Sequence, residues 1–73
     1  FFNAVRARKL AISLNNVGNY MHDKDDDQEG ARHFYALAVE VDPTYQCAHD
    51  NLKMIDDLIY LEDTRDEEFF STQ

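Results

Sequence analysis

The sequence of 73 residues lacks the features that usually hold a small protein together. Its one cysteine, Cys47, excludes an internal disulfide, and no spacing of cysteine and histidine is typical of a structural zinc site. A chain of this size buries only about 60% of its unfolded surface, so its core is thin. Because these staples are missing, we expect neighbours to stabilise the chain, either more of the same polypeptide or other subunits.

Long apolar runs are also missing. No stretch of about 18 apolar residues occurs, so the sequence predicts no transmembrane segment, and no uncleaved secretory signal is visible. We therefore expect an intracellular protein, in the cytoplasm or inside an organelle. The sequence begins with Phe1 rather than methionine, and we expect a processed, truncated or incompletely represented chain.

Positive charges are scarce, because seven lysines and arginines stand against 15 acidic residues and the net charge is −8. Arg6, Arg8 and Lys9 make the beginning basic, whereas acidic residues gather in a predicted turn at 23–29 and again at 56–68. Such a field repels phosphate backbones, so the charge argues against nucleic-acid binding. A basic protein partner, or simple solubility, fits it better.

The spacing of apolar residues predicts a first helix over residues 2–22. An apolar stripe recurs at positions i, i+4, i+7 and i+11, which fall on one side of an α-helix. Small residues flank this stripe and would let a second helix approach closely. The stripe consists of Leu10, Leu14, Val17 and Met21, and the small residues are Ala7, Ala11 and Gly18.

A second helix is predicted over residues 28–41. Asp26 is the expected N-cap, with Glu29 three residues on as in a capping box, and acidic residues in a first turn favour the helix dipole. Pro43 ends the helix, because the residue before a proline is pushed out of the α region. The expected apolar stripe is Ala31, Phe34, Tyr35, Ala38 and Val41.

A third helix is predicted over residues 45–62, where Ala48, Leu52, Ile55 and Ile59 repeat the spacing of the first stripe. The last residues, 63–73, are polar apart from two phenylalanines and are expected to form a flexible acidic tail. No segment alternates with period two, so no strand is predicted. The sequence therefore predicts an all-α domain over residues 1–62, an antiparallel helical hairpin followed by a third helix.

The order Leu14-x2-Val17-Gly18-x2-Met21, Ala31-x3-Tyr35-x2-Ala38 and Pro43 resembles one divergent tetratricopeptide repeat, a helix–turn–helix unit of about 34 residues. The match spans residues 11–58. It departs from the family pattern by one extra residue in the acidic turn and by Lys53, which stands where a second repeat would have glycine. The resemblance implies a right-handed helical array in which the third helix caps the repeat.

The resemblance also implies a shallow concave groove lined by the first and third helices. Asparagines suit such a groove, because each amide can hold an extended peptide backbone. The lysines of the family's carboxylate clamp are absent, and Asp50 brings the wrong charge, so no clamp is expected. The groove residues would be Ile12, Asn15, Asn16, Asn19, His22, Asp50, Asn51 and Met54.

The sequence supports neither a calcium site nor a catalytic site. The order Asp25-x-Asp27-x-Glu29-Gly30 imitates half of an EF-hand, but Ala36 stands where the bidentate glutamate belongs. No residues supply a nucleophile, a base and an orienting group together. We therefore expect no enzyme, no cofactor, no metal and no small-molecule ligand.

The tail carries one short motif. Glu68, Phe69, Phe70 and Ser71 resemble the pair of phenylalanines in an acidic tract that docks onto the major sperm protein domain of endoplasmic-reticulum tethering proteins. An acidic run steers a peptide to a basic surface, and one phenylalanine can anchor in a pocket. The alternative is that the two phenylalanines pack on the third helix or on a neighbour.

Two hypotheses of function remain, both for a protein–protein interaction element. The chain is either a structural or scaffold subunit, or a fragment of one, within a larger complex, or a peptide-binding adaptor that uses the groove. The short length and the missing staples favour the structural subunit.

Overall fold

The computed structural model describes the backbone of residues 3–71 and the side chains of residues 3–64. It contains the helices α1 (Ala4–Asp23), α2 (Gln28–Val41) and α3 (Gln46–Ser71), and no strand occurs among the described residues. The prediction of an all-α protein with three helices is confirmed. No described helix combines the length and the apolar character needed to cross a bilayer.

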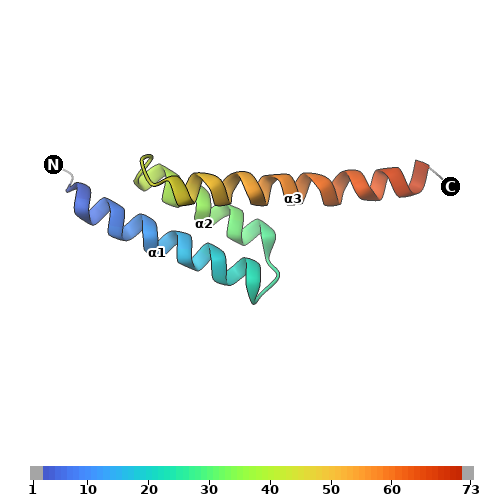
Figure 1. Cartoon of the computed structure of the whole chain (residues 1–73). Coiled ribbons are helices and arrows are strands. Elements are labelled where there is room, and N and C mark those ends of the chain that lie inside the picture. Colours follow the sequence, from blue (N-terminus) through green and yellow to red (C-terminus); the bar gives the residue numbers. More distant parts are fainter. Residues whose placement is uncertain (1–2, 72–73) are drawn as a thin grey trace.

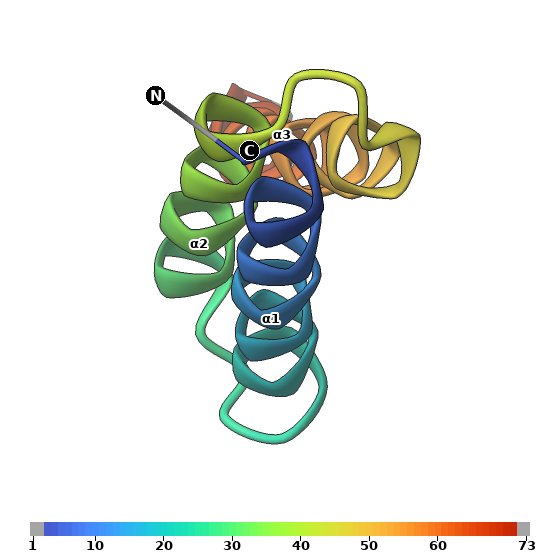
Figure 2. The ribbon, with the colours of Figure 1, turned by 90° about the vertical axis from the view of Figure 1, so that its left-hand side faces the viewer.

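The helices α1 and α2 form a packed hairpin, and α3 packs against α2. Figure 1 shows α3 running along α2, with the second half of α3 extending beyond the hairpin. Figure 2 shows α1 and α2 side by side, with the turn at 24–27 joining the end of α1 to the beginning of α2. The molecule is therefore elongated, with principal extents of 57 × 22 × 15 Å.

Polar side chains fix the beginnings of α1 and α2. Asn3 Oδ1 accepts hydrogen bonds from the backbone N–H groups of Val5 and Arg6, so α1 begins after Asn3 rather than near residue 2. The N-cap of α2 is Asp27, whose Oδ1 accepts from Gly30 N at 2.9 Å. The prediction that Asp26 is this N-cap is wrong, because Asp26 has a left-handed φ of 52° and belongs to the turn.

The helix α3 is longer than the sequence predicted. It begins at Gln46 and its backbone stays helical to Ser71, so the expected end near Glu62 is wrong. No glycine or proline follows Pro43, and nothing else in the chain breaks the helix where the apolar stripe ends. The side chains of Glu68, Phe69, Phe70 and Ser71, on which the tail motif depends, lie outside the described residues.

The core is thin and is built mostly from alanine. One cluster joins all three helices through buried Ala11, Ala38 and Ala48, and a second is built on Ala31, Tyr35 and Ile55. Tyr35 and Ile55 are the largest fully buried side chains among the described residues. Partly buried neighbours complete the clusters: Leu14, Val39, Val41 and Tyr45 in the first, and Met21, Leu52, Met54, Leu58 and Ile59 in the second.

The face of α1 that α2 covers differs from the predicted stripe. The buried residues of α1 are Ala7, Ala11, Asn15 and Gly18, whereas Leu10 and Val17 remain 49% and 42% exposed. The small residues Ala7, Ala11 and Gly18, which were expected to let a second helix approach, are therefore buried, whereas only part of the predicted stripe is covered. α2 packs on the side of α1 that carries the small residues, because the two helices can come closest there. The larger side chains are left at the edge of the contact.

Candidate functional site

Three of the predicted groove asparagines are linked by hydrogen bonds that start from Asn51. The Asn51 amide donates to Asn15 Oδ1 at 3.0 Å and to Asn19 Oδ1 at 3.5 Å. The Tyr35 hydroxyl donates to Asn19 Oδ1 at 2.7 Å, and burial, together with the charge of Asp23, raises the pKa of this phenol. The network connects all three helices, and Asn15 is only 4% exposed. Its first effect is to fix the packing of α1 against α3.

The other predicted groove residues are spread around the network. Ile12, Asn16 and Asp50 are exposed, and Asp50 accepts a hydrogen bond from the Gln46 amide. Met54 is half-buried against the second core cluster. His22 is half-buried, and its Nδ1 atom is enclosed without a hydrogen-bond partner in the described part of the chain.

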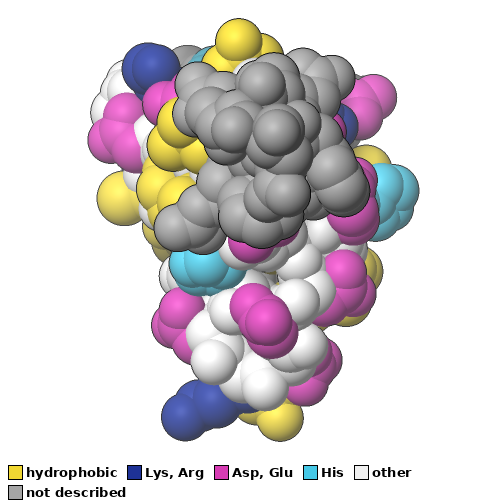
Figure 3. All heavy atoms as spheres, turned by 90° about the vertical axis from the view of Figure 1, so that its right-hand side faces the viewer, with side chains coloured by type: hydrophobic (Ala, Val, Ile, Leu, Met, Phe, Trp, Pro, Cys, Tyr) yellow, Lys and Arg dark blue, Asp and Glu magenta, His cyan; other side chains and the backbone are white. Residues whose placement is uncertain are grey.

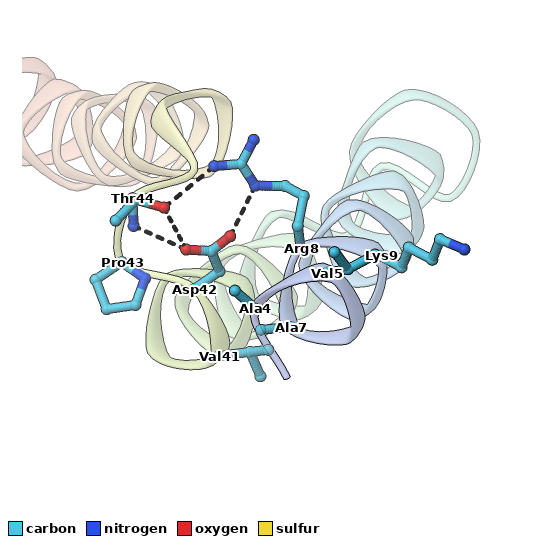
Figure 4. A pocket seen from close by; sticks show the side chains of 9 residues that line it. All are labelled: Ala4, Val5, Ala7, Arg8, Lys9, Val41, Asp42, Pro43 and Thr44. Carbon is cyan, nitrogen blue, oxygen red and sulfur yellow. Dashed lines mark hydrogen bonds and ion pairs between the residues drawn. The ribbon is translucent and has the colours of Figure 1, made fainter. Parts of the chain in front are cut away.

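A polar cluster that the sequence analysis missed connects α1 to the turn between α2 and α3. Arg8 Nε binds Asp42 Oδ2 at 2.7 Å, and Arg8 Nη2 donates to Thr44 Oγ1 at 3.1 Å. The Thr44 backbone N–H and hydroxyl both donate to Asp42 Oδ1 (Figure 4). The Arg8 guanidinium also lies 5.1 Å from the centre of the Tyr45 ring, a cation–π distance. Arg8 and Asp42 are 34 residues apart, and no local pattern indicates their pairing.

Hydrogen bonds from the Thr44 side chain and from Arg8 lower the pKa of Asp42 to about 2. An unfolded aspartate has a pKa of about 3.9, so the stabilising effect is present above pH 4 and is lost as pH falls toward 2. We predict that Asp42→Asn removes this part of the acid dependence, because asparagine stays uncharged throughout. Thermal unfolding of both chains between pH 2 and 6 measures it. Equal losses of stability in acid for both chains would contradict the role given to Asp42.

A hollow of about 700 Å³ opens beside this cluster, at the beginning of α1. Figure 4 shows its apolar walls, with the Arg8 guanidinium turned toward Asp42 and Thr44 and the Lys9 side chain directed away from them. Because Arg8 already has partners, the hollow offers apolar contact more than a charged anchor. Its lining residues are Ala4, Val5, Ala7, Arg8, Lys9, Val41, Asp42, Pro43 and Thr44.

The opposite end of the hairpin is acidic. Figure 3 looks at this end of the molecule, where acidic side chains predominate over basic ones. The acidic turn meets the middle of α3 around a hollow of about 300 Å³. Among the described residues, no group of three or more histidine, cysteine, aspartate or glutamate side chains is placed to hold a metal ion. The lining residues include Asp26, Asp27, Glu29, Glu62 and Asp63.

Several apolar side chains lie on the side of the hairpin that faces away from α3, and three of them, Leu14, Met21 and Val41, also pack against the core clusters. Successive residues of a helix turn by about 100°, so Asn15 and Asn19, which contact α3, mark the opposite flank of α1 from Leu10 and Val17. Arg32, which binds Asp56 of α3, likewise marks the opposite side of α2 from Phe34, Leu37 and Val41. We call this surface the outer face. It comprises Leu10, Leu14, Val17, Met21, Phe34, Leu37 and Val41.

The apolar side chains of the outer face are only partly covered. Leu10 and Val17 are exposed, and the other members are half-buried, so each still presents apolar area to solvent. The regular spacing of apolar residues on α1 already indicated this surface in the sequence. The spacing does not show how α1 is rotated about its own axis relative to α2. That rotation places Leu10 and Val17, half of the stripe, outside the contact with α2.

Comparison of the chain with protein-family models, with curated proteins and with solved structures yields no match. The proposal of function below is therefore based on the packing and exposure of the chain's own side chains.

Proposed function

We propose that this chain is a protein–protein interaction element, a small structural or scaffold subunit, or a fragment of one, whose outer face is covered by protein in its working state. The observation that carries the proposal is the exposure of Leu10 and Val17 in the middle of α1. A helix stabilises a fold by burying its apolar side, and here none of the described side chains fully covers Leu10 and Val17.

The tetratricopeptide resemblance is part of this proposal. A side chain on Gly18 would place its Cβ 2.6 Å from Tyr35 Cε1 and 3.2 Å from the Ala31 carbonyl oxygen. The small residues that carry the resemblance thus stand where α1 and α2 come closest. This supports a repeat-like hairpin, and α3 lies against α2 as a following helix would.

The second candidate is a peptide-binding adaptor that uses the groove between α1 and α3. It is less well supported, because the Asn51 amide nitrogen and the side-chain oxygens of Asn15 and Asn19 are already hydrogen-bonded to one another. Only Asn16 and Asp50 remain exposed there with polar groups, and a peptide would have to compete with the existing network for the others. Docking through the tail phenylalanines remains a minor proposal.

The partner in this proposal is a protein rather than a nucleic acid, given the net charge of −8. The exposed free thiol of Cys47 fits a reducing, intracellular compartment. No cofactor and no enzymatic activity form part of the proposal.

The test compares two exposed positions of α1 in the assembled protein. In a Cys47→Ser chain, Val17→Cys and Asn16→Cys each place one thiol, on the outer face and in the groove respectively. We expect alkylation of Val17→Cys to be at least tenfold slower in the native assembly than in the isolated chain diluted well below micromolar concentration, with Asn16→Cys unchanged. Protection of Asn16→Cys alone would contradict the scaffold proposal and support the adaptor.

A further inference from the structure

We propose that the cover of the outer face is a second copy of this chain, related to the first by a twofold axis, so that the two hairpins form a four-helix arrangement with α1 antiparallel to its partner. The inference rests on the proposed function and names the partner. An isologous contact of this kind uses one patch twice, and the patch must then be complementary to itself.

The spacing of the stripe on α1 has the required self-complementarity. Leu10, Leu14, Val17 and Met21 are separated by four, three and four residues, so the stripe reads the same in both directions. In an antiparallel pair centred between Leu14 and Val17, Leu10 of one copy lies opposite Met21 of the other. Apolar side chains then meet along the whole contact.

The outer-face residues of α2, together with the half-buried Gly30 that precedes them, follow the same rule. Gly30, Phe34, Leu37 and Val41 are also separated by four, three and four residues. The two stripes are aligned, because Met21 Cε lies 2.7 Å from the position that a Cβ on Gly30 would occupy. One axis can therefore serve both helices, with α1 lying over α1 and α2 over α2 of the partner.

The charges along α1 favour the antiparallel arrangement. The exposed Arg6 and Lys9 lie near its beginning, and the acidic turn at 23–29 follows its end, with a net charge of −4 after Lys24 is counted. Reversal of the partner brings each basic end near the other copy's acidic turn, whereas a parallel pair would bring like charges together. α3 packs on the side of the hairpin opposite the outer face, through Asn51 to α1 and Asp56 to α2.

The area of the outer face sets the expected affinity of the dimer. Two helices of about 20 and 30 Å, lying side by side, present a face of roughly 500 Å², and a twofold pair would bury about twice that. This reaches the lower bound of about 1,000 Å² for a specific interface. We therefore expect a dimer that forms at micromolar concentration rather than an obligate one.

Analytical ultracentrifugation of the full chain between 1 and 200 µM tests the proposal. The average mass should rise from one to two chain masses, and Val17→Glu should abolish the rise while circular dichroism at the same concentration retains helix. Leu10→Glu is the second variant, in case the first fails to fold. The matched control is Ile12→Glu, a similarly exposed aliphatic on the α3 side of α1, which should dimerise as the parent does. A chain that stays monomeric over the whole range, folded or not, overturns the proposal.

Cross-linking tests the direction of the helices. In the Cys47→Ser chain, Leu10→Cys mixed with Met21→Cys should give mostly the mixed disulfide dimer on mild oxidation. Leu10→Cys alone should remain unlinked, because two such residues lie about 16 Å apart along antiparallel helices and disulfide Cα atoms need about 6 Å. Rapid disulfide formation by Leu10→Cys alone would contradict the antiparallel pair. If the chain is monomeric while Val17→Cys is still protected in the native assembly, the scaffold function stands and the second copy is excluded.

Discussion

Replacement of Tyr35 by alanine is expected to remove a large part of the free energy of unfolding of the isolated chain. Tyr35 is fully buried and contacts the second core cluster, and its hydroxyl completes the network of asparagines. Truncating a buried aromatic residue costs about 3–5 kcal/mol, and a chain of this length has roughly 4–11 kcal/mol of stability in total. Urea unfolding followed by circular dichroism at 222 nm measures the loss.

Two variants separate the causes of that loss. Tyr60→Ala removes the same side chain from a position on α3 that is 67% exposed, and it should change stability by less than about 0.5 kcal/mol. Tyr35→Phe keeps the ring and removes only the hydroxyl, which should cost about 1 kcal/mol. Equal effects of Tyr35→Ala and Tyr60→Ala would mean that the described core is wrong.

Replacement of Gly18 by alanine is expected to destabilise the hairpin, although alanine is the better helix former. The new Cβ would lie 2.6 and 2.7 Å from two carbon atoms of the buried Tyr35 ring. The hydroxyl of this ring is bonded to Asn19, so the ring cannot turn aside without breaking that bond. Overpacking costs about 1–3 kcal/mol and the gain in helix propensity is about 1 kcal/mol, so we expect a net loss of up to about 2 kcal/mol.

Gly30→Ala is the matched control for Gly18→Ala. A Cβ on Gly30 would meet the Asp27 carboxylate and Met21 Cε, which are the far ends of flexible side chains. The gain in helix propensity and a weakened N-cap are each worth about 1 kcal/mol, so we expect almost no net change. A stabilising Gly18→Ala would contradict the close approach of α1 and α2 at this point.

The sequence predicted the elements well and their ends less well. Apolar spacing located all three helices, and Asp42-Pro43 marked the end of α2, where the structure also ends it. Consecutive aspartates at 25–27 each suit an N-cap, and only the turn geometry decides that Asp27 takes this role. The far end of α3 carries no stop signal, so the loss of apolar character was mistaken for the end of the helix.

The candidate sites show what periodicity alone leaves open. The sequence indicated that Asn15, Asn19 and Asn51 share one side of the molecule, and the structure brings them together. Their mutual bonding depends on the distance between α1 and α3, which no spacing within one helix determines. Likewise the stripe on α1 was visible, but the choice between Ala11 and Leu10 as the buried side depends on how closely α2 can approach.

The most direct test of the account is thermal unfolding of the full chain by circular dichroism at two protein concentrations a hundredfold apart. If a second copy completes the fold by covering the outer face, the unfolding midpoint rises with concentration, and Val17→Glu removes the rise. An unfolding midpoint that is identical at both concentrations would contradict the claim that a second copy of the chain covers the outer face.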